Sequence, residues 1–487
     1  MMKWPGFIGP SYQSQSVLAD VERCVNWYPE PVEAPSGKNK YALYPTPGQR
    51  AFCTLPAIGS RALFAMNNRM HAVSGGTLAE VSASGTVTTR GTVVQDTQLA
   101  QIAYNGRAGN QLLVASGGNG YCLDLTSNTF SQVLTGDCVQ VGMIDGYFLA
   151  FNGTQYRISS LNDGTTWNPT QFQMRSIAPD PWQAMVVDGQ RQIWLIGEQT
   201  SEVHYNANSF PFPFAPIPGA VMKFGTPAPW SPAAAADSMM WLTQTSGGAG
   251  MVVQARGYTP QRISTYAVET AIARYARTSR ITDAESLVYE DQGHVFYALT
   301  FPSANATWVY DLTTQLWHER GTWNAPSYQF DRWHPRVHCY AFGQHLVGET
   351  ATGVLSTLDT TIGSEVDQSA IRRVRIAPAL AAQGEPLYFG ELEVYLQTGL
   401  GLTTGQGQRP IAMLRTSDDG GQTWGNERTC GAGPMGAFDT RVFWTRLGRS
   451  YDRAIELSVS DPIPWRVIDA WMTVDGPQQG APPQGPG

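Results

Sequence analysis

Apolar and polar residues alternate along most of the chain, in short runs separated by turns rich in Asn, Asp and Gly. Alternation with a period of two predicts half-buried β-strands, and DG, NG and GG pairs supply the positive φ that two-residue hairpins need. A unit of such runs recurs in seven copies: 62–81, 99–125, 141–160, 183–205, 237–255, 286–312 and 338–358. The copies lie about 40 to 55 residues apart, in the range of propeller blades. The pattern predicts a β-propeller of about seven blades over residues 55–362, with six or eight as alternatives.

The pattern changes on both sides of this repeat. Between residues 371 and 474 the alternating runs are longer, which predicts an antiparallel β-sandwich at 363–475. Residues 1–54 contain few regular elements and many aromatics and prolines, and they are expected to form an extended arm along another surface, because their backbone needs partners. Residues 476–487, GPQQGAPPQGPG, predict a disordered tail. The expected fold class is all-β.

Residues 264–280 depart from the strand pattern. Apolar residues recur there near helical spacing, which predicts one short helix between two blades. Its basic edge consists of arginines at three-residue steps: Arg274, Arg277 and Arg280. We interpret this edge as a solvated face, with an interface or a phosphate contact as the alternative.

Composition agrees with an all-β chain and narrows its partners. Charged residues make up 15 % of the 487 residues, against about 25 % in an average protein, while Gly (50) and Pro (32) are frequent. The net charge of −7 argues against a protein that wraps nucleic acid, but it would let DNA slide past without sticking. Six cysteines without a CxxC pair predict free thiols. No run approaches the ~20 apolar residues of a membrane span, so no membrane insertion is expected.

Two octets share one frame, SLNDGTTW at 160–167 and SDDGGQTW at 417–424, and this frame resembles the Asp-box of sialidases and other propellers. The Asx side chain can accept hydrogen bonds from turn amides, the Gly can adopt positive φ and the Trp can pack into the sheet. Each shared residue thus has a fold-building role, and we interpret both octets as structural turns. The shared positions are Ser160, Asn162, Gly164 and Trp167 in the first octet, and Ser417, Asp419, Gly421 and Trp424 in the second.

No catalytic, metal or cofactor site is expected. A sialidase needs an arginine cluster and a tyrosine nucleophile activated by a carboxylate, whereas the arginines here are spread singly. His334 and His338 flank PRV in a strand pattern, which makes helical i,i+4 metal ligation implausible. Arg372, Arg373 and Arg375 alternate across a strand, and we expect them to be solvated.

Three regions resemble the tail-hub, or packaged-DNA stabilisation, proteins of short-tailed bacteriophages. The first comprises VNWYPEPVEAPSGK and ALYPTPG within residues 25–48, and the second comprises YAVETAIARYAR and ESLVYEDQGHVFYALTFP within 266–302. The third, TRVFWTRLGRSYDRAIELSVSDP at 440–462, contains the most specific piece, TRVFWTRLGR. The similar pieces follow one another in chain order and span most of the sequence.

This resemblance implies a non-enzymatic structural protein of the virion tail. It implies a tail hub or stopper that assembles in the host cytoplasm, forms a hexameric ring below the portal and adaptor rings and closes the DNA channel after packaging. It further implies that the hub anchors a tail needle, spikes or fibres, and that double-stranded DNA passes its lumen without sequence-specific contacts. The resemblance identifies no catalytic residue and no cofactor.

Residues of the arm and of the third region are candidates for contacts between subunits. They combine aromatic and proline residues of the arm with the densest basic stretch of the sandwich: Tyr28, Pro29, Arg441, Trp444, Arg446, Arg449 and Arg453. The alternative for the arginines is an ordinary exposed strand face. Two alternative functions stay open, a glycan-binding or sialidase-like propeller, which rests on the octets alone, and a receptor-binding tail protein.

Overall fold

The computed structural model describes residues 1–34, 40–175, 177–245, 248, 250–382 and 384–475. These residues form two compact units. The first contains Met1–Gly48, Leu316–Gln329 and the residues from Thr360 onward; the second contains Gln49–Gln315 and Phe330–Asp359. The expected tail at 476–487 lies outside the described residues, and the domain boundaries after residues 54, 362 and 475 remain a prediction.

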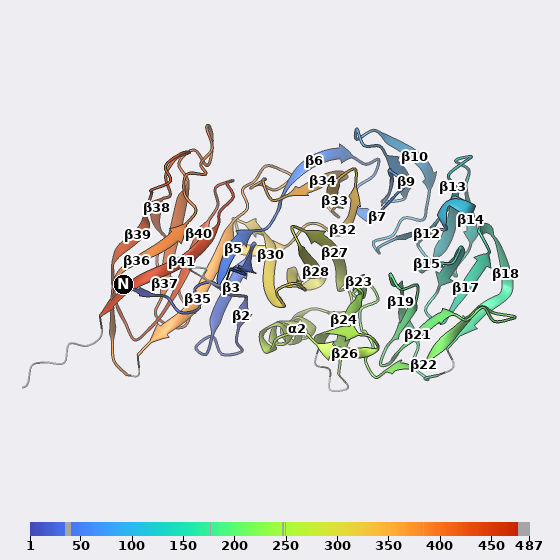
Figure 1. The fold of residues 1–487 in the computed structure, drawn as a ribbon, viewed down its shortest axis with the longest axis horizontal. Helices are drawn as coiled ribbons and strands as arrows, with labels where there is room; N and C mark the ends of the chain where they lie inside the picture. The colour runs from blue at the N-terminus through green and yellow to red at the C-terminus, as the bar shows by residue number, and fades with distance from the viewer. Residues whose placement is uncertain (35–39, 176, 246–247, 249, 383, 476–487) are drawn as a thin grey trace, which may run out of the picture. The chain divides into compact units, whose positions relative to one another are not determined.

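The second unit is a β-propeller (Figure 1). Within the described residues it contains six four-stranded antiparallel sheets and the strands β27 to β29, which together make seven blades. Blade 1 contains β7 (Ser60–Met66), β8 (Arg69–Ser74), β9 (Thr77–Val81) and β10 (Val87–Thr92). Blade 2 contains β11 (Gln101–Tyr104), a short helix α1 (Gly106–Gly109), β12 (Gln111–Ser116), β13 (Asn119–Asp124) and β14 (Phe130–Leu134). Blade 3 contains β15 (Gln140–Ile144), β16 (Tyr147–Phe151), β17 (Gln155–Ser160) and β18 (Asp163–Met174).

The remaining blades follow the same order, from the innermost strand outward. Blade 4 contains β19 (Trp182–Val187), β20 (Ile193–Gly197), β21 (Ser201–Asn206) and β22 (Phe214–Met222). Blade 5 contains β23 (Ala233–Ala235), β24 (Ser238–Gln244), β25 (Gly250–Arg256) and β26 (Thr259–Arg262). Blade 6 contains β27 (Glu285–Asp291), β28 (His294–Phe301) and β29 (Ala306–Asp311), with a 3-10 turn η1 (Pro302–Ala304). Blade 7 contains β32 (Val337–Ala341), β33 (Gln344–Gly348) and β34 (Val354–Asp359).

A strand from the other end of the sequence completes the last blade. The strand β6 (Gly48–Thr54) precedes blade 1 in the chain, yet it is the outer strand of blade 7, next to β34. The innermost strands also contact one another around the axis, including β32 and β7. The ring is therefore closed by pairing between the two ends of the repeat, which confirms the propeller expected from the sequence.

Hairpin turns form where the sequence pattern placed them. Asp145 and Gly146 have φ values of 54° and 84° and join β15 to β16, and Asn67 and Asn68, at 47° and 58°, join β7 to β8. Two consecutive residues with positive φ define the tight turn whose twist matches paired strands. The Asp-Gly and Asn-Asn pairs thus form these hairpin turns through their own backbone conformation.

The predicted helix is present as α2 (Tyr266–Thr278), between β26 and β27. Thr265 caps its N-terminus by accepting a hydrogen bond from the amide of Val268. The buried face consists of apolar residues: Ala267, Val268, Ala271, Ile272 and Tyr275. Arg274, Arg277 and Arg280 are exposed, so the basic edge faces solvent in the described chain.

The first unit contains two antiparallel β-layers built around one core. One layer has the order β39-β36-β41-β5-β4, with β1 paired to β41; the other contains β3-β35-β40-β37-β38, with β2 paired to β3. The strands after residue 360 are β35 (Arg373–Ala381), β36 (Leu387–Leu396), β37 (Ile411–Ser417), β38 (Arg428–Gly431), β39 (Val442–Ser450), β40 (Asp452–Val459) and β41 (Val467–Asp475). The earlier strands are β1 (Met2–Lys3), β2 (Tyr12–Gln13), β3 (Val21–Val25), β4 (Trp27–Pro31), β5 (Tyr41–Pro45) and β30 (Leu316–Asn324), which β31 (Gln329–Arg332) follows in the chain.

Residues from the first 48 positions are part of this core. Trp4, Trp27 and Leu43 are each 0 % exposed and pack in one cluster with side chains of the C-terminal strands. The indole of Trp27 donates a hydrogen bond to the carbonyl of Trp465, at 3.0 Å. Described residues of the N-terminal segment are therefore part of the sandwich core.

The expectation that the arginines at the start of β35 are solvated was wrong. Arg372, Arg373 and Arg375 are 7 %, 1 % and 0 % exposed. Arg375 donates to the carbonyls of residues 6, 7, 10 and 23 and pairs with Glu22. A buried guanidinium is stable only when its donors are satisfied, and the N-terminal segment supplies those acceptors. Sequence alternation could not show this, because the partners lie about 350 positions away in the chain.

Candidate functional site

The first octet forms the β17–β18 connection of blade 3. Its polar turn depends on Asp163, whose carboxylate accepts from the amide and hydroxyl of Thr165 at 2.9 and 2.6 Å. Positive φ falls on Asn162 (57°) and not on Gly164, so the role expected for that glycine was wrong. Gly164 is instead tightly packed, since a Cβ there would lie 2.7 Å from the ring of Phe148.

The remaining two shared residues of this octet also hold the turn together. The indole of Trp167 donates to the carbonyl of Gly164 at 2.8 Å and packs against the core between blades 2 and 3. Ser160 ends β17, and its carbonyl accepts from the hydroxyl of Ser159 at 2.8 Å. All these contacts are made within the propeller.

The second octet begins at Ser417, the last residue of β37 in the sandwich. Asp419 accepts from the amide and hydroxyl of Thr423, and Ser417 accepts from the amide of Gly421 at 2.8 Å. These hydrogen bonds, first among them the one from the Thr423 hydroxyl, lower the pKa of Asp419 to about 2. Gly421 has φ of 85°, and Arg415 lies over the ring of Trp424 at 5.5 Å. The side chains are occupied by the turn itself.

Four of the candidate interface residues have buried side chains in the described chain. Tyr28 and Trp444 are each 3 % exposed, and Pro29 is buried opposite Leu43 in the β4–β5 pair. Arg453 is also 3 % exposed; it forms a two-pronged ion pair with Asp418 at 2.7 and 2.8 Å and lies over Phe389 at 4.7 Å.

The other three candidate residues are exposed on or next to β39. Arg446 and Arg449 face solvent. Arg441 is 56 % exposed and pairs with Glu391 and Glu393 at 3.0 and 2.7 Å. These carboxylates raise the pKa of Arg441, and Arg441 lowers that of Glu393 by its hydrogen bond. Of the four arginines in this basic stretch, Arg453 is buried in an ion pair and the other three are exposed.

Polar side chains at the start of the innermost strands link neighbouring blades around one mouth of the propeller axis. Gln101 accepts from the amide of Val141 in the next blade at 3.0 Å, and Gln140 accepts from the amide of Met185 in the following one at 2.7 Å. Arg61, 2 % exposed, donates to the Ser116 hydroxyl at 2.8 Å and pairs with Asp96. Burial lowers the pKa of Arg61, and Asp96 opposes that shift. Each link adds about 1 kcal/mol, so together they stabilise the ring.

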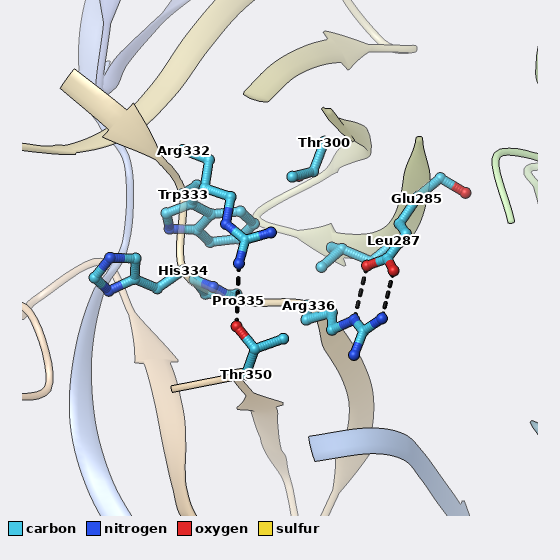
Figure 2. A pocket seen from close by; sticks show the side chains of 10 residues that line it. Glu285, Leu287, Thr300, Arg332, Trp333, His334, Pro335, Arg336 and Thr350 are labelled. Carbon is cyan, nitrogen blue, oxygen red and sulfur yellow. Dashed lines mark hydrogen bonds and ion pairs between the residues drawn. The ribbon is translucent and has the colours of Figure 1, made fainter. Parts of the chain in front are cut away.

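The ion pair between Arg336 and Glu285 continues this belt between blades 7 and 6. Figure 2 shows the two side chains meeting through parallel hydrogen bonds, of 2.7 Å and 2.5 Å. Arg336 also donates to the carbonyl of Thr97, at 2.9 Å. Arg332 points toward Thr350 on the other side of the pocket and donates to its hydroxyl at 3.1 Å.

Two hollows adjoin this belt. The pocket in Figure 2 leaves about 10 Å³ for the centre of a water-sized molecule, so it has room for about one water molecule and none for a larger ligand. The second hollow leaves about 260 Å³ for the centres of water-sized molecules and lies at the mouth of the axis; its lining includes Arg61, Gln101, Trp230, Arg336 and His338. It is of small-molecule size. Arg61 and Arg336 already face carboxylates, so these arginines are not available to a substrate in the manner of a sialidase.

A histidine pair lies beside the same mouth. His338, on β32, lies 3.1 Å from His345 on β33, with the rings stacked at 5.3 Å. Burial, and secondly the neighbouring His345, lower the pKa of His338 to about 4. The pair is on strands, in agreement with the expectation for His338, while His334 lies in a loop. Among the described residues no group of three His, Cys, Asp or Glu could hold a metal ion.

The cysteines and helices add two further observations. All six cysteines, which belong to the described part of the chain, carry free thiols, and burial raises the pKa of Cys24 and Cys339 to about 12. No helix within the described ranges has the length and apolarity needed to cross a membrane.

Sequence reasoning missed the inter-blade belt. Its members share one position, at or next to the first residue of an innermost strand: Arg61, Gln101, Gln140, Glu285 and Arg336. An alignment of the repeat units on their first strand would have found a polar residue recurring there. Apolar alternation carries no information about these polar positions, so it did not reveal the belt.

Two family models match the chain, and both describe bacteriophage P22 Gp10. The model of its β-propeller matches residues 22–363, and the model of its β-sandwich matches residues 372–475. Together they include both octets, α2 and all the candidate interface residues. Among curated proteins, none matches the chain.

Solved structures match the chain with low identity and low TM-scores. The N-terminal domain of Nup159 shares 10 % identity with a TM-score of 0.41, over 69 % of this chain and 98 % of that chain. Streptogramin B lyase shares 9 % with a TM-score of 0.39, over 64 % and 97 %. The extracellular domain of a putative hybrid two-component system from B. thetaiotaomicron shares 8 % with a TM-score of 0.44, over 83 % and 50 %. These values support no inference about function.

Proposed function

Because the chain belongs to the bacteriophage P22 Gp10 family and is a structural protein of the phage tail, we propose that it is the tail hub. In this role it assembles as a ring, on the implied sixfold pattern, below the portal and adaptor rings. It closes the DNA channel after packaging and anchors the tail needle, spikes or fibres. The observation that carries the proposal is the match of both family models, in order, over residues 22–363 and 372–475.

Three features of the molecule support a ring through which DNA passes. The net charge of −7 disfavours adhesion of DNA to the lumen. The hollow on the propeller axis leaves only about 260 Å³ for the centres of water-sized molecules, so a duplex would run between copies rather than through one propeller. Arg441, Arg446 and Arg449 are accessible and remain our candidates for contacts between subunits.

We also propose that the protein has no catalytic activity. The octet that suggested a sialidase uses Asp163 and Trp167 for its own turn, and Asp419 does the same in the sandwich. The arginines at the axial hollow are paired with carboxylates. A fluorogenic sialoside assay should give no turnover; activity that disappears with a single Tyr→Phe substitution would establish the glycan-active alternative.

Imaging of assembled particles tests the hub role directly. The purified chain is mixed with portal and adaptor rings and examined by electron microscopy, with an antibody fragment against residues 384–475 as a position marker. We expect a ring of density coaxial with the adaptor and next to it. Label at the distal tip of the virion tail, away from the channel axis, would instead identify a receptor-binding protein.

A further inference from the structure

Phe210 stands out on the surface of the propeller. Its side chain is 98 % exposed, whereas exposed aromatic residues elsewhere in the described chain retain partial cover, Tyr266 being 69 % exposed and Phe438 71 %. The residue lies in the loop 207–213 between β21 and β22 of blade 4. Covering an apolar ring with a partner removes it from water and lowers the free energy, so a fully exposed ring requires an explanation.

Hydrogen bonds within the loop hold the backbone on both sides of Phe210. The hydroxyl of Ser209 donates to the carbonyl of Phe212 at 2.6 Å, and the amide of Ala207 donates to the carbonyl of Pro213 at 2.8 Å. Phe212 packs inward, 5.7 Å from the ring of Tyr156 and 6.0 Å from that of Phe214. A loop backbone that is already ordered loses less conformational entropy on binding, which favours Phe210 as an interface anchor.

The anchor lies in one of two uncharged segments, which belong to neighbouring blades. Residues 164–174 of β18 and residues 206–222 around β22 contain no Asp, Glu, Lys or Arg. The two segments meet where the side-chain amide of Gln171 donates to the carbonyl of Pro211 at 2.8 Å. Further apolar side chains of these segments are exposed, namely Phe172 and Met174 on β18 and Val221 on β22, as is Tyr205 next to the second segment. We call these two segments the neutral patch.

We propose that the neutral patch is a contact surface for a second copy of this chain, with Phe210 as its anchor. A chain of net charge −7 repels its own copies, and that repulsion is smallest where a surface carries no charge. Contacts between different proteins commonly use complementary charges, whereas permanent contacts between identical chains have more apolar cores. The absence of basic residues in both segments also disfavours an anionic lipid surface as the partner. This inference rests on the ring assembly proposed above, and it identifies a surface through which neighbouring copies in the ring would bind one another.

The test compares Phe210→Asp with Tyr266→Asp, a control that places the same charge at another exposed aromatic residue of the propeller, outside the neutral patch. Both proteins are first compared with the wild type by circular dichroism and thermal melting, and neither substitution should alter folding. Assembly is then measured by mass photometry over a concentration series, alone and with portal–adaptor rings. We expect Phe210→Asp to weaken association between copies about 30-fold, and Tyr266→Asp to leave it unchanged. Met174→Asp, at the other segment of the patch, should act in the same direction as Phe210→Asp.

Each contrary outcome identifies which proposal fails. If the wild type forms rings and the Phe210→Asp protein forms them equally well, the role of the neutral patch is overturned and the hub role stays intact. The same holds if Phe210→Asp forms normal rings but loses another tail component, because the partner is then a different protein. A wild-type chain that stays monomeric, alone and on the adaptor ring, overturns both proposals.

Discussion

The two compact units are both made of antiparallel strands, yet they are assembled in opposite ways. In the propeller, nearly every strand pairs with the strand before or after it in the chain, and only β6 comes from a distance. In the sandwich unit, β3 pairs with β35 and β5 pairs with β41, across more than 300 residues. The propeller is accordingly stabilised by repeated local hairpins, whereas the sandwich depends on a few long-range contacts. Loss of one distant segment should therefore damage the sandwich far more than the propeller.

We expect N-terminal truncation to give the largest difference in stability between the two units. A protein starting at Gly48 lacks β1 to β5 and the core residues Trp4, Trp27 and Leu43, so we expect the strands of residues 373–475 to lose protection from hydrogen exchange. The propeller should keep its protection, because β6 remains to complete blade 7. A protein starting at Leu55 lacks β6 as well, and its propeller should also lose protection. Full protection of residues 373–475 in the first truncation would show instead that the N-terminal segment is a dispensable arm.

A single buried arginine provides a finer version of this comparison. Arg375→Met removes the donors to four backbone carbonyls and leaves Glu22 without its partner. Breaking a buried pair costs about 3–5 kcal/mol, and the loss should be confined to the sandwich unit. Denaturant titration followed by peptide-resolved hydrogen exchange measures it. Arg441→Met, which removes an exposed ion pair, is the control and should change stability by less than about 1 kcal/mol.

Acid should weaken the propeller through His338. Its pKa is about 4 in the folded chain, where burial and His345 disfavour the cation, and near 6.5 when unfolded. Between these values the unfolded chain binds more protons, so stability is fully present above pH 6.5 and falls as the pH decreases toward 4. The loss amounts to roughly 3 kcal/mol.

Melting curves of wild type and His338→Gln between pH 7.5 and 4.5 test this dependence. The variant should show a flatter decline of Tm with falling pH. His334→Gln is the control, because that side chain is 42 % exposed. An unchanged slope in the His338 variant would mean that other groups determine the acid sensitivity.

The two octets give the smallest predicted difference. Gly421→Ala combines a positive φ of 85° with a Cβ only 2.5 Å from Val21, whereas Gly164→Ala has no positive φ and meets the ring of Phe148 at 2.7 Å and the sulfur of Cys122 at 3.2 Å. We expect losses of about 1–3 kcal/mol in each case, larger for Gly421. Gly431→Ala, where a Cβ meets nothing within 4 Å, should be neutral. Equal losses at Gly164 and Gly421, measured by denaturant midpoints, would show that backbone strain contributes little.

The sequence determined what depends on neighbours along the chain. Strand alternation, the Asp145–Gly146 turn, α2 and the blade repeat follow from contacts within a few residues, and the structure confirms them. It also predicted that the octets are turns, although their hydrogen bonds fall on Asp163 in one and on Asp419 in the other.

Only the tertiary structure decided which residues lie inside. Arg375 and Arg446 look alike in the sequence, yet one is buried among distant carbonyls and the other is exposed. The role of β6 in blade 7 and the exposure of Phe210 depend equally on where remote segments meet. The physical reason is that alternation records which side of a strand a residue faces, whereas burial depends on what covers that side.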